Sequence, residues 1–357
     1  MHVLFGLSTF STLSDPRMGS EVAAATMARY LARRQRIKVT MANILWTGFE
    51  PDQFDLVHLW NAGGHKGPYA LAARLARAAG RPLLMTPIYW PYGPGDEQAA
   101  REGMGASRED VDVFRKKRQL IDDALASALA QCDLLLPNAH REAEAARRLL
   151  EERGYPVPRM EVVWNAFDDE LFGSARPLPW RRRRPWIVSI GRVEAAKNVV
   201  TLAEAFREFR KRRPGAKLLV IGLIAREYFH RNLDRLVGPG VEFWGPIPHA
   251  DVPDILARAR VHVLLGIHET PGLSSLEAAA MGCSVVVSSA AYGTMREYFG
   301  DMAVEVDPFD ARSVAEGLER AWEGPPPELR EAVWERFSAS KVAARLAEIY
   351  NRHCDGR

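Results

Sequence analysis

Cysteine is scarce in this chain of 357 residues, and long apolar runs are absent. The three cysteines, Cys132, Cys283 and Cys354, do not lie at the spacing of a disulfide pair or a metal site, so a reducing, cytoplasmic compartment is expected. No run of about 18 apolar residues occurs, which argues against a membrane-spanning helix. The N-terminal segment MHVLFGLSTF lacks both a basic stretch and a long apolar core, so it predicts no signal peptide.

Neither positive nor negative charge is in large excess, because the formal net charge is only +3. A dedicated nucleic-acid binder would carry a larger basic surplus, so nucleic acid is not an expected partner. The 47% hydrophobic and 26% charged residues are typical of a soluble globular protein, and the length suffices for two domains.

One basic segment, residues 29–38, stands out from this even distribution, with Arg33, Arg34, Arg36 and Lys38. Such a segment could lie against anionic lipid, which would make the protein peripheral to the inner membrane face. The alternative is the ordinary solvated end of a helix, and charge patterning leaves both open.

Short apolar runs alternate with longer helical ones along the first half. We expect strands at residues 2–7, 37–42, 54–60, 82–86, 133–136 and 160–165, and helices at 20–34, 69–79, 108–130 and 140–153. This alternation predicts a parallel sheet covered by helices on both faces, with ligands at the carboxyl ends of the strands.

A Pro- and Arg-rich segment, SARPLPWRRRRP, separates this half from a second series of strands. Its composition is that of an interdomain linker, and Arg181 to Arg184 are expected to form a solvated charge run. Further strands are expected at residues 186–190, 217–222, 241–244 and 261–265, with helices from 226 and 250. The predicted domains are therefore 1–173, joined by a terminal helix at 338–357, and 174–337.

Two long loops of the first half could bind part of a ligand, such as the acceptor of a transferred group. Residues 8–19 end at a helix start where Gly19 permits close backbone approach and Ser20 could be the N-cap. The loop PIYWPYGPGDEQ, rich in proline and glycine, is expected to lack regular structure and to offer the rings of Tyr89 and Trp90. Plain capping and plain packing remain open alternatives for these loops.

The run HETPGLSSLEAAAMGCSVVV, residues 268–287, joins a buried strand to a helix and another strand. The Pro–Gly turn predicts unpaired backbone N–H groups near Gly272, Leu273 and Ser274, which is an anion-binding arrangement. Glu269 at the mouth of this loop and Glu277 on the helix would accept hydrogen bonds from hydroxyl groups. His268, the first residue of this run, is also expected to bind the donor of the transferred group.

A second ligand-binding element, GRVEAAKN, follows the first strand of the second half. Gly191 provides the turn, and Arg192 and Lys197 project where a ligand of that sheet is expected. Two cations that bracket a loop suit a diphosphate, because arginine binds it bidentately and lysine adds a point charge. Solvated surface cations are the alternative for this pair taken alone.

Together these motifs resemble the retaining glycosyltransferases of family 4, also described as glycosyl transferases group 1. The run ETPGLSSLEAAAMGCSVVVSS is similar to the family's donor-binding signature, with Pro271 where the family usually has Phe. GRVEAAKN resembles the family's diphosphate element, and NAFD resembles the element that closes its first domain. Ile88 stands where members often carry a histidine.

This resemblance implies an α/β fold of the GT-B type, with two facing Rossmann-like domains and a cleft between them. It implies transfer of a sugar, with retention, from a UDP or GDP sugar to a hydroxyl of a glycan, glycolipid or small molecule. In these roles Arg192 and Lys197 would hold the diphosphate, Glu269 the sugar and Glu277 the ribose. No Asp-x-Asp pair is placed to hold a metal, and neither a metal nor a separate cofactor is expected.

Two other classes of protein fit the same sequence. One is a different GT-B enzyme, such as a sugar-nucleotide epimerase or a phosphorylase. The other is a non-catalytic sugar-binding protein of this fold, which the substitutions at Pro271 and Ile88 would suit.

Overall fold

The computed structural model describes residues 1–7, 19–44, 50–60 and 67–354, which form two compact units. The first unit comprises Met1–Pro91, Phe114–Ala166 and Phe337–Arg357, and the second comprises Tyr92–Val113 and Phe167–Arg336. The second unit thus takes in residues 92–113, which the predicted domain limits assign to the first half. Most of the predicted loop 8–19 lies outside the described residues.

The first unit is built on a parallel sheet of six strands in the order β2-β1-β3-β4-β5-β6. These strands are β1 (His2–Leu7), β2 (Lys38–Asn43), β3 (Leu56–Trp60), β4 (Leu83–Thr86), β5 (Leu134–Leu135) and β6 (Arg159–Met160). Its helices are α1 (Gly19–Gln35), α2 (Gly67–Ala78), part of α4 (Arg108–Leu129), α5 (His140–Glu152) and α15 (Ala339–Cys354).

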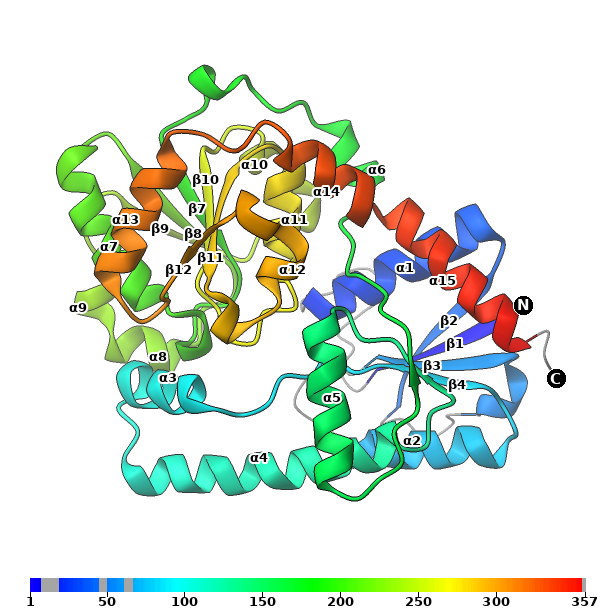
Figure 1. Ribbon diagram of the computed structural model, residues 1–357. Helices are drawn as coiled ribbons and strands as arrows, with labels where there is room; N and C mark the ends of the chain where they lie inside the picture. The colour runs from blue at the N-terminus through cyan, green and yellow to red at the C-terminus, as the bar shows by residue number, and fades with distance from the viewer. Residues whose placement is uncertain (8–18, 45–49, 61–66, 355–357) are drawn as a thin grey trace. The chain divides into compact units, whose positions relative to one another are not determined.

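Helices cover both faces of this sheet (Figure 1). The buried faces of α2, α4 and α5 pack with β3 and β4 into one apolar cluster. On the other face the terminal helix α15 packs against α1. A buried hydrogen-bond chain ties α15 to the sheet, because His58 contacts Tyr350 Oη at 2.6 Å and Thr86 Oγ1 at 2.9 Å.

The second unit also contains six parallel strands, in the order β12-β11-β10-β7-β8-β9. They are β7 (Trp186–Ile190), β8 (Lys217–Ile221), β9 (Val241–Gly245), β10 (Val261–Leu264), β11 (Ser284–Ser288) and β12 (Val304–Val306). Chain order reverses between β7 and β10, which are hydrogen-bonded neighbours. Ligands of such doubly wound sheets bind where the carboxyl ends of those two strands diverge.

Helices of this unit also lie on both faces of the sheet (Figure 1). They are α3 (Pro94–Met104), α6 (Asp169–Ser174), α7 (Val199–Arg212), α8 (Arg226–Arg231), α9 (Leu233–Leu236), α10 (Val252–Leu256), α11 (Leu273–Ala280), α12 (Met295–Phe299), α13 (Ala311–Trp322) and α14 (Leu329–Phe337). The helices α7 and α13 share one apolar core with the strands, and α11 packs against β10 and β11.

These two Rossmann-like α/β units confirm the predicted fold class. Most strand predictions were confirmed, because buried parallel strands such as LLVI are continuous apolar runs. The prediction of a strand at residues 160–165 was wrong beyond Met160, because β6 comprises only Arg159–Met160. The sequence analysis did not single out β12, whose three residues are too few for a periodic pattern. No helix in the described ranges is long and apolar enough to cross a lipid bilayer.

The prediction that PIYWPYGPGDEQ lacks regular structure was wrong, because α3 begins inside it at Pro94. Proline is well tolerated in the first turn of a helix, where its missing N–H has no intrahelical partner. The Asp96 carboxylate also accepts a hydrogen bond from the N–H of Gly93 at 2.8 Å, which caps the helix start.

The prediction of a solvated run at Arg181 to Arg184 was wrong for Arg183, which is only 6% exposed. Its guanidinium donates to the carbonyl oxygens of Ala259 at 2.7 Å and Met281 at 2.6 Å. These carbonyls follow α10 and α11, where a cation complements the helix dipole. Within the described ranges no carboxylate pairs with Arg183, so backbone oxygens provide most of its hydrogen-bond acceptors, with Cys283 Sγ as a further acceptor at 3.5 Å.

We predict that Arg183→Ala lowers the free energy of unfolding by about 3 kcal/mol, because it removes several charge-assisted hydrogen bonds and leaves buried carbonyls unpaired. The exposed neighbour gives the matched control, and Arg182→Ala should change stability by less than about 0.5 kcal/mol. Urea unfolding of both variants measures the difference. Equal effects of the two variants would show that stability depends on the total charge of the linker and not on the hydrogen bonds from Arg183 to buried carbonyls.

A pH dependence follows from two buried histidines, because burial lowers the pKa of His58 and that of His262 to about 3. Both pKa values lie below the unfolded value, so the unfolded state binds more protons as pH falls from about 6.5 toward 3. We expect each histidine to cost up to about 1.4 kcal/mol of stability per pH unit in this window. Above about pH 6.5 these two histidines do not lower the stability, because they are neutral in both the folded and the unfolded state.

His262→Leu tests this expectation, because the nitrogens of His262 have no hydrogen-bond partner among the described residues. The slope of unfolding free energy between pH 6 and pH 4 should become flatter by about 1.4 kcal/mol per unit. The control is His230→Gln at an exposed site, which should leave the slope unchanged. An unchanged slope in His262→Leu would contradict the assigned pKa shift.

Candidate functional site

The loops that follow β7 and β10 lie against each other at the point where strand order reverses. The N–H of Ile267 donates to the Ala196 carbonyl at 3.0 Å, and the Asn198 amide donates to the Leu265 carbonyl at 3.0 Å. Both predicted donor motifs are therefore held together by hydrogen bonds between their own loops.

Lys197 and Glu269, predicted from separate motifs, meet in this region. The Lys197 ammonium donates to the Glu269 carboxylate, and only 22% and 7% of their side chains are exposed. The Glu269 carbonyl also accepts a hydrogen bond from the Thr294 N–H at 2.9 Å, which fixes its backbone. A half-buried ion pair of this kind places one positive and one negative group side by side at the carboxyl end of the sheet.

Arg192 occupies a more open position on the same loop. Its guanidinium pairs with Glu194 at 2.9 Å, and 49% of its side chain is exposed. The structure thus places Arg192 at the rim and Lys197 in the interior. The turn itself depends on close backbone approach, since a Cβ on Gly222 would lie 2.0 Å from the Gly191 carbonyl oxygen.

Two glycines make room for the Glu269 carboxylate. A Cβ at Gly266 would lie 1.9 Å from Glu269 Oε1, and a Cβ at Gly272 would lie 2.7 Å from Oε2. Gly272 also has φ of 75°, a region that favours glycine. The carboxylate is therefore seated in a slot whose walls are bare backbone.

Gly272 is the N-cap of α11, so Leu273 and Ser274 form its first turn as predicted. The N–H groups of a first helical turn lack intrahelical acceptors and favour anions. The Ser274 hydroxyl donates to the Ile190 carbonyl at 2.8 Å, which ties the helix start to the end of β7. These N–H groups thus open beside the loop that carries Arg192 and Lys197.

Glu277 lies farther along α11, on the same side of the unit. It is 5% exposed and contacts His249 Nε2 at 2.6 Å, just before α10. His249 was not among the predicted site residues. Its place in the segment FWGPIPHADVPDIL gave no periodic or spacing signal, and only the fold brings it to Glu277.

His268 is held by a residue that the sequence analysis also missed. Its Nε2 lies 3.0 Å from Asp96 Oδ2 on α3, and its backbone has φ of 68°. The N–H of His268 donates to the Tyr292 carbonyl at 2.7 Å. Asp96 and His268 are far apart in sequence, so no local pattern could have linked them.

The predicted acceptor residues belong to the first unit. Tyr89 is 5% exposed and lies in the apolar core, so its ring is packed and does not offer a free face. Trp90 stacks with the guanidinium of Arg141, whose Cζ lies 5.4 Å from the ring centroid. Gly19 begins α1, which puts Ser20 inside the first turn and not at the N-cap.

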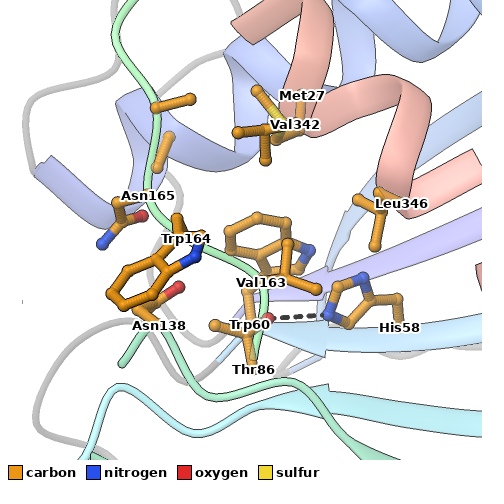
Figure 2. A pocket seen from close by; sticks show the side chains of 12 residues that line it. Met27, His58, Trp60, Thr86, Asn138, Val163, Trp164, Asn165, Val342 and Leu346 are labelled. Carbon is orange, nitrogen blue, oxygen red and sulfur yellow. Dashed lines mark hydrogen bonds between the residues drawn. The ribbon is translucent and has the colours of Figure 1, made fainter. Parts of the chain in front are cut away.

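Near the ends of β3 and β4 a small cavity opens in the first unit (Figure 2). Its volume of about 10 Å³ has room for roughly one water molecule. His58, Thr86, Trp60 and Trp164 are among the residues that line it, and His58 and Thr86 are hydrogen-bonded to each other. The Nε1 of Trp60 has no hydrogen-bond partner among the described residues.

The arrangement of the second unit suits an anion with attached hydroxyl groups, because cations, helix N–H groups and carboxylates converge at one sheet edge. Within the part of the chain that the structure describes, no group of three or more His, Cys, Asp or Glu is placed to hold a metal ion.

The second unit also matches a family of known proteins. Residues 174–336 match the sequence profile of the family described as glycosyl transferases group 1. Glycogen synthase of Mycobacterium tuberculosis is 28% identical over 217 residues, which cover 55% of this chain and 49% of that protein. The chain therefore spans about half the length of that curated relative.

Solved structures show the same fold over the whole chain. Sucrose-phosphate synthase from Thermosynechococcus elongatus superposes with a TM-score of 0.72 at 17% identity and covers 100% of both chains. The Anabaena protein HepE, solved in complex with UDP, gives a TM-score of 0.69 at 15% identity over 99% of this chain and 100% of that one. At this identity the likeness establishes the fold.

We predict that Gly266→Ala destabilises the second unit by about 1 to 3 kcal/mol, because the added methyl group must displace the Glu269 carboxylate and its contact with Lys197. The matched control is Gly215→Ala, where an added Cβ meets nothing within 4 Å. Chemical unfolding compares the two, and the control should be neutral or slightly stabilising. If both variants were equally stable, the slot around Glu269 would not be closed.

Proposed function

We propose that this protein is a retaining glycosyltransferase of family 4, which moves a sugar from a nucleoside diphosphate to a hydroxyl acceptor. The observation that carries this proposal is the meeting of Lys197 and Glu269 beside the first turn of α11. The match of residues 174–336 to glycosyl transferases group 1 supports it.

In this proposal the positive groups act on the leaving diphosphate. Lys197, Arg192 and the first N–H groups of α11 stabilise the charge that builds when the bond from the anomeric carbon to the diphosphate oxygen breaks. Preorganised donors of this kind can each lower the barrier by about 3 kcal/mol. The acceptor oxygen then bonds to the anomeric carbon on the same face, and its proton passes to a diphosphate oxygen.

The acidic groups hold the parts of the donor that carry hydroxyls. Glu269 accepts hydrogen bonds from the sugar, and Glu277, oriented by His249, accepts them from the ribose. A UDP or GDP sugar fits this set, and the HepE structure with UDP supports the nucleotide class. The acceptor side is assigned to the first unit, where Trp90 is the remaining aromatic candidate.

We expect Glu269→Gln to reduce turnover at least a hundredfold, since a neutral amide both weakens sugar binding and no longer pairs with Lys197. Lys197→Ala should give a similar loss, because the diphosphate then lacks its interior cation. The assay combines the purified protein with UDP-glucose or GDP-mannose and a panel of hydroxyl acceptors, and mass spectrometry detects the transferred hexose.

The control is Lys211→Ala, an exposed lysine of α7 that pairs with Glu208, and it should retain full turnover. Thermal midpoints of all variants separate loss of function from unfolding. Turnover that survives both Glu269→Gln and Lys197→Ala would refute the assignment. Product formed without an added acceptor, or only with inorganic phosphate, would favour an epimerase or a phosphorylase instead.

A further inference from the structure

Helix α3 comes from the first half of the sequence but packs on the loops of the second unit that carry the predicted donor groups. A Cβ at Gly103 would lie 2.8 Å from Ala195 Cβ in the loop after β7, and a Cβ at Gly95 would lie 3.6 Å from Ile267 Cγ2 in the loop after β10. The buried Asn232 amide fastens the helix by donating to the Gly103 carbonyl at 2.8 Å. Two glycines thus let α3 approach both ligand loops closely.

Asp96 points from the start of this helix to His268. One oxygen, Oδ2, accepts from the Gly93 N–H at 2.8 Å and lies 3.0 Å from His268 Nε2. The Asp96 side chain is 17% exposed and that of His268 is 25% exposed. The pair is therefore half-buried, and a bond to the helix start fixes the carboxylate.

This contact determines which nitrogen of His268 carries the proton. An ionised carboxylate only accepts hydrogen bonds, so Nε2 must donate to Asp96. In the neutral ring Nδ1 is then an acceptor. Within the described residues no hydrogen bond to Nδ1 is present, while the backbone of His268 is held by Tyr292.

We infer that Asp96 is a positioning residue that orients His268 so that Nδ1 accepts a hydrogen bond from a hydroxyl of the donor's sugar. The inference rests on the proposed function and deepens it. His268 directly precedes Glu269, so two acceptors lie on neighbouring residues at the sugar end of the site. The preferred donor is then a sugar with two free hydroxyls there, and the diphosphate and ribose are held by other groups.

The test separates binding of the sugar from binding of the nucleotide. Calorimetric titration of the full chain measures Kd for UDP and for UDP-glucose, and for GDP and GDP-mannose. Asp96→Ala should weaken binding of the sugar nucleotide about tenfold, the effect of one lost hydrogen bond, and leave Kd for the free nucleoside diphosphate unchanged. Asp96→Asn, whose carbonyl can still accept from Nε2, should recover most of the affinity.

His268→Asn removes the ring while keeping a residue type that tolerates positive φ. His268→Asn should also weaken binding of the sugar nucleotide and leave Kd for the free nucleoside diphosphate unchanged. Combining it with Asp96→Ala should weaken binding no further, because both substitutions act through one hydrogen bond. The control is Asp110→Ala, since Asp110 also accepts from a backbone N–H three residues earlier, that of Ser107 at 2.9 Å, but at the start of α4. It should change neither Kd.

Each other outcome overturns the inference. Equal weakening of nucleotide and sugar nucleotide by Asp96→Ala would mean that α3 serves only to brace the loops. No change in either Kd would mean that His268 does not meet the sugar. If the unaltered protein binds neither nucleotide pair, the proposed function falls and the inference falls with it.

Discussion

The contact between Lys197 and Glu269 is the interaction on which the candidate site depends. It exists because chain order in the second sheet reverses between β7 and β10, so that loops distant in sequence become neighbours. Without that reversal each loop would place its charge alone at a sheet edge, where it would be an ordinary solvated group. The fold thus converts two common surface motifs into one converging set.

The close approach of backbone segments determines how near the groups of the candidate site can come to one another. Gly266 and Gly272 leave space for the Glu269 carboxylate, and Gly222 lets the loop after β7 pass against the next strand. Each position would place a Cβ within a clashing distance of a site atom, so side chains are excluded for steric reasons. The same logic extends to Gly95 and Gly103, through which α3 reaches the two loops. The site is therefore shaped by absent side chains as much as by those present.

The sequence predicted most of the strands and the fold class, and it picked out the two loops whose Lys197 and Glu269 meet, because buried strands and glycine-containing loops leave local patterns. It did not predict partners that only the fold brings together. Arg183 appeared to be one of four equivalent arginines, yet its hydrogen bonds to buried acceptors distinguish it. Asp96 and His249 likewise meet His268 and Glu277 across long stretches of chain. Pairing of this kind is a tertiary property, and composition or periodicity carries no record of it.

Every charged group of the candidate site already has a partner of opposite charge or a histidine. Lys197 meets Glu269, Arg192 meets Glu194, Glu277 meets His249 and Asp96 meets His268. Such pairing compensates each half-buried charge, and it holds each side chain in one orientation before a ligand binds. A diphosphate would bring negative charge of its own, and Lys197 could then divide its three donors between the phosphate and Glu269. The ammonium can bridge both groups, whereas a neutral residue at this position would leave the two anions facing each other. A lysine beside a buried carboxylate would therefore let the proposed site accept both a phosphate and a sugar.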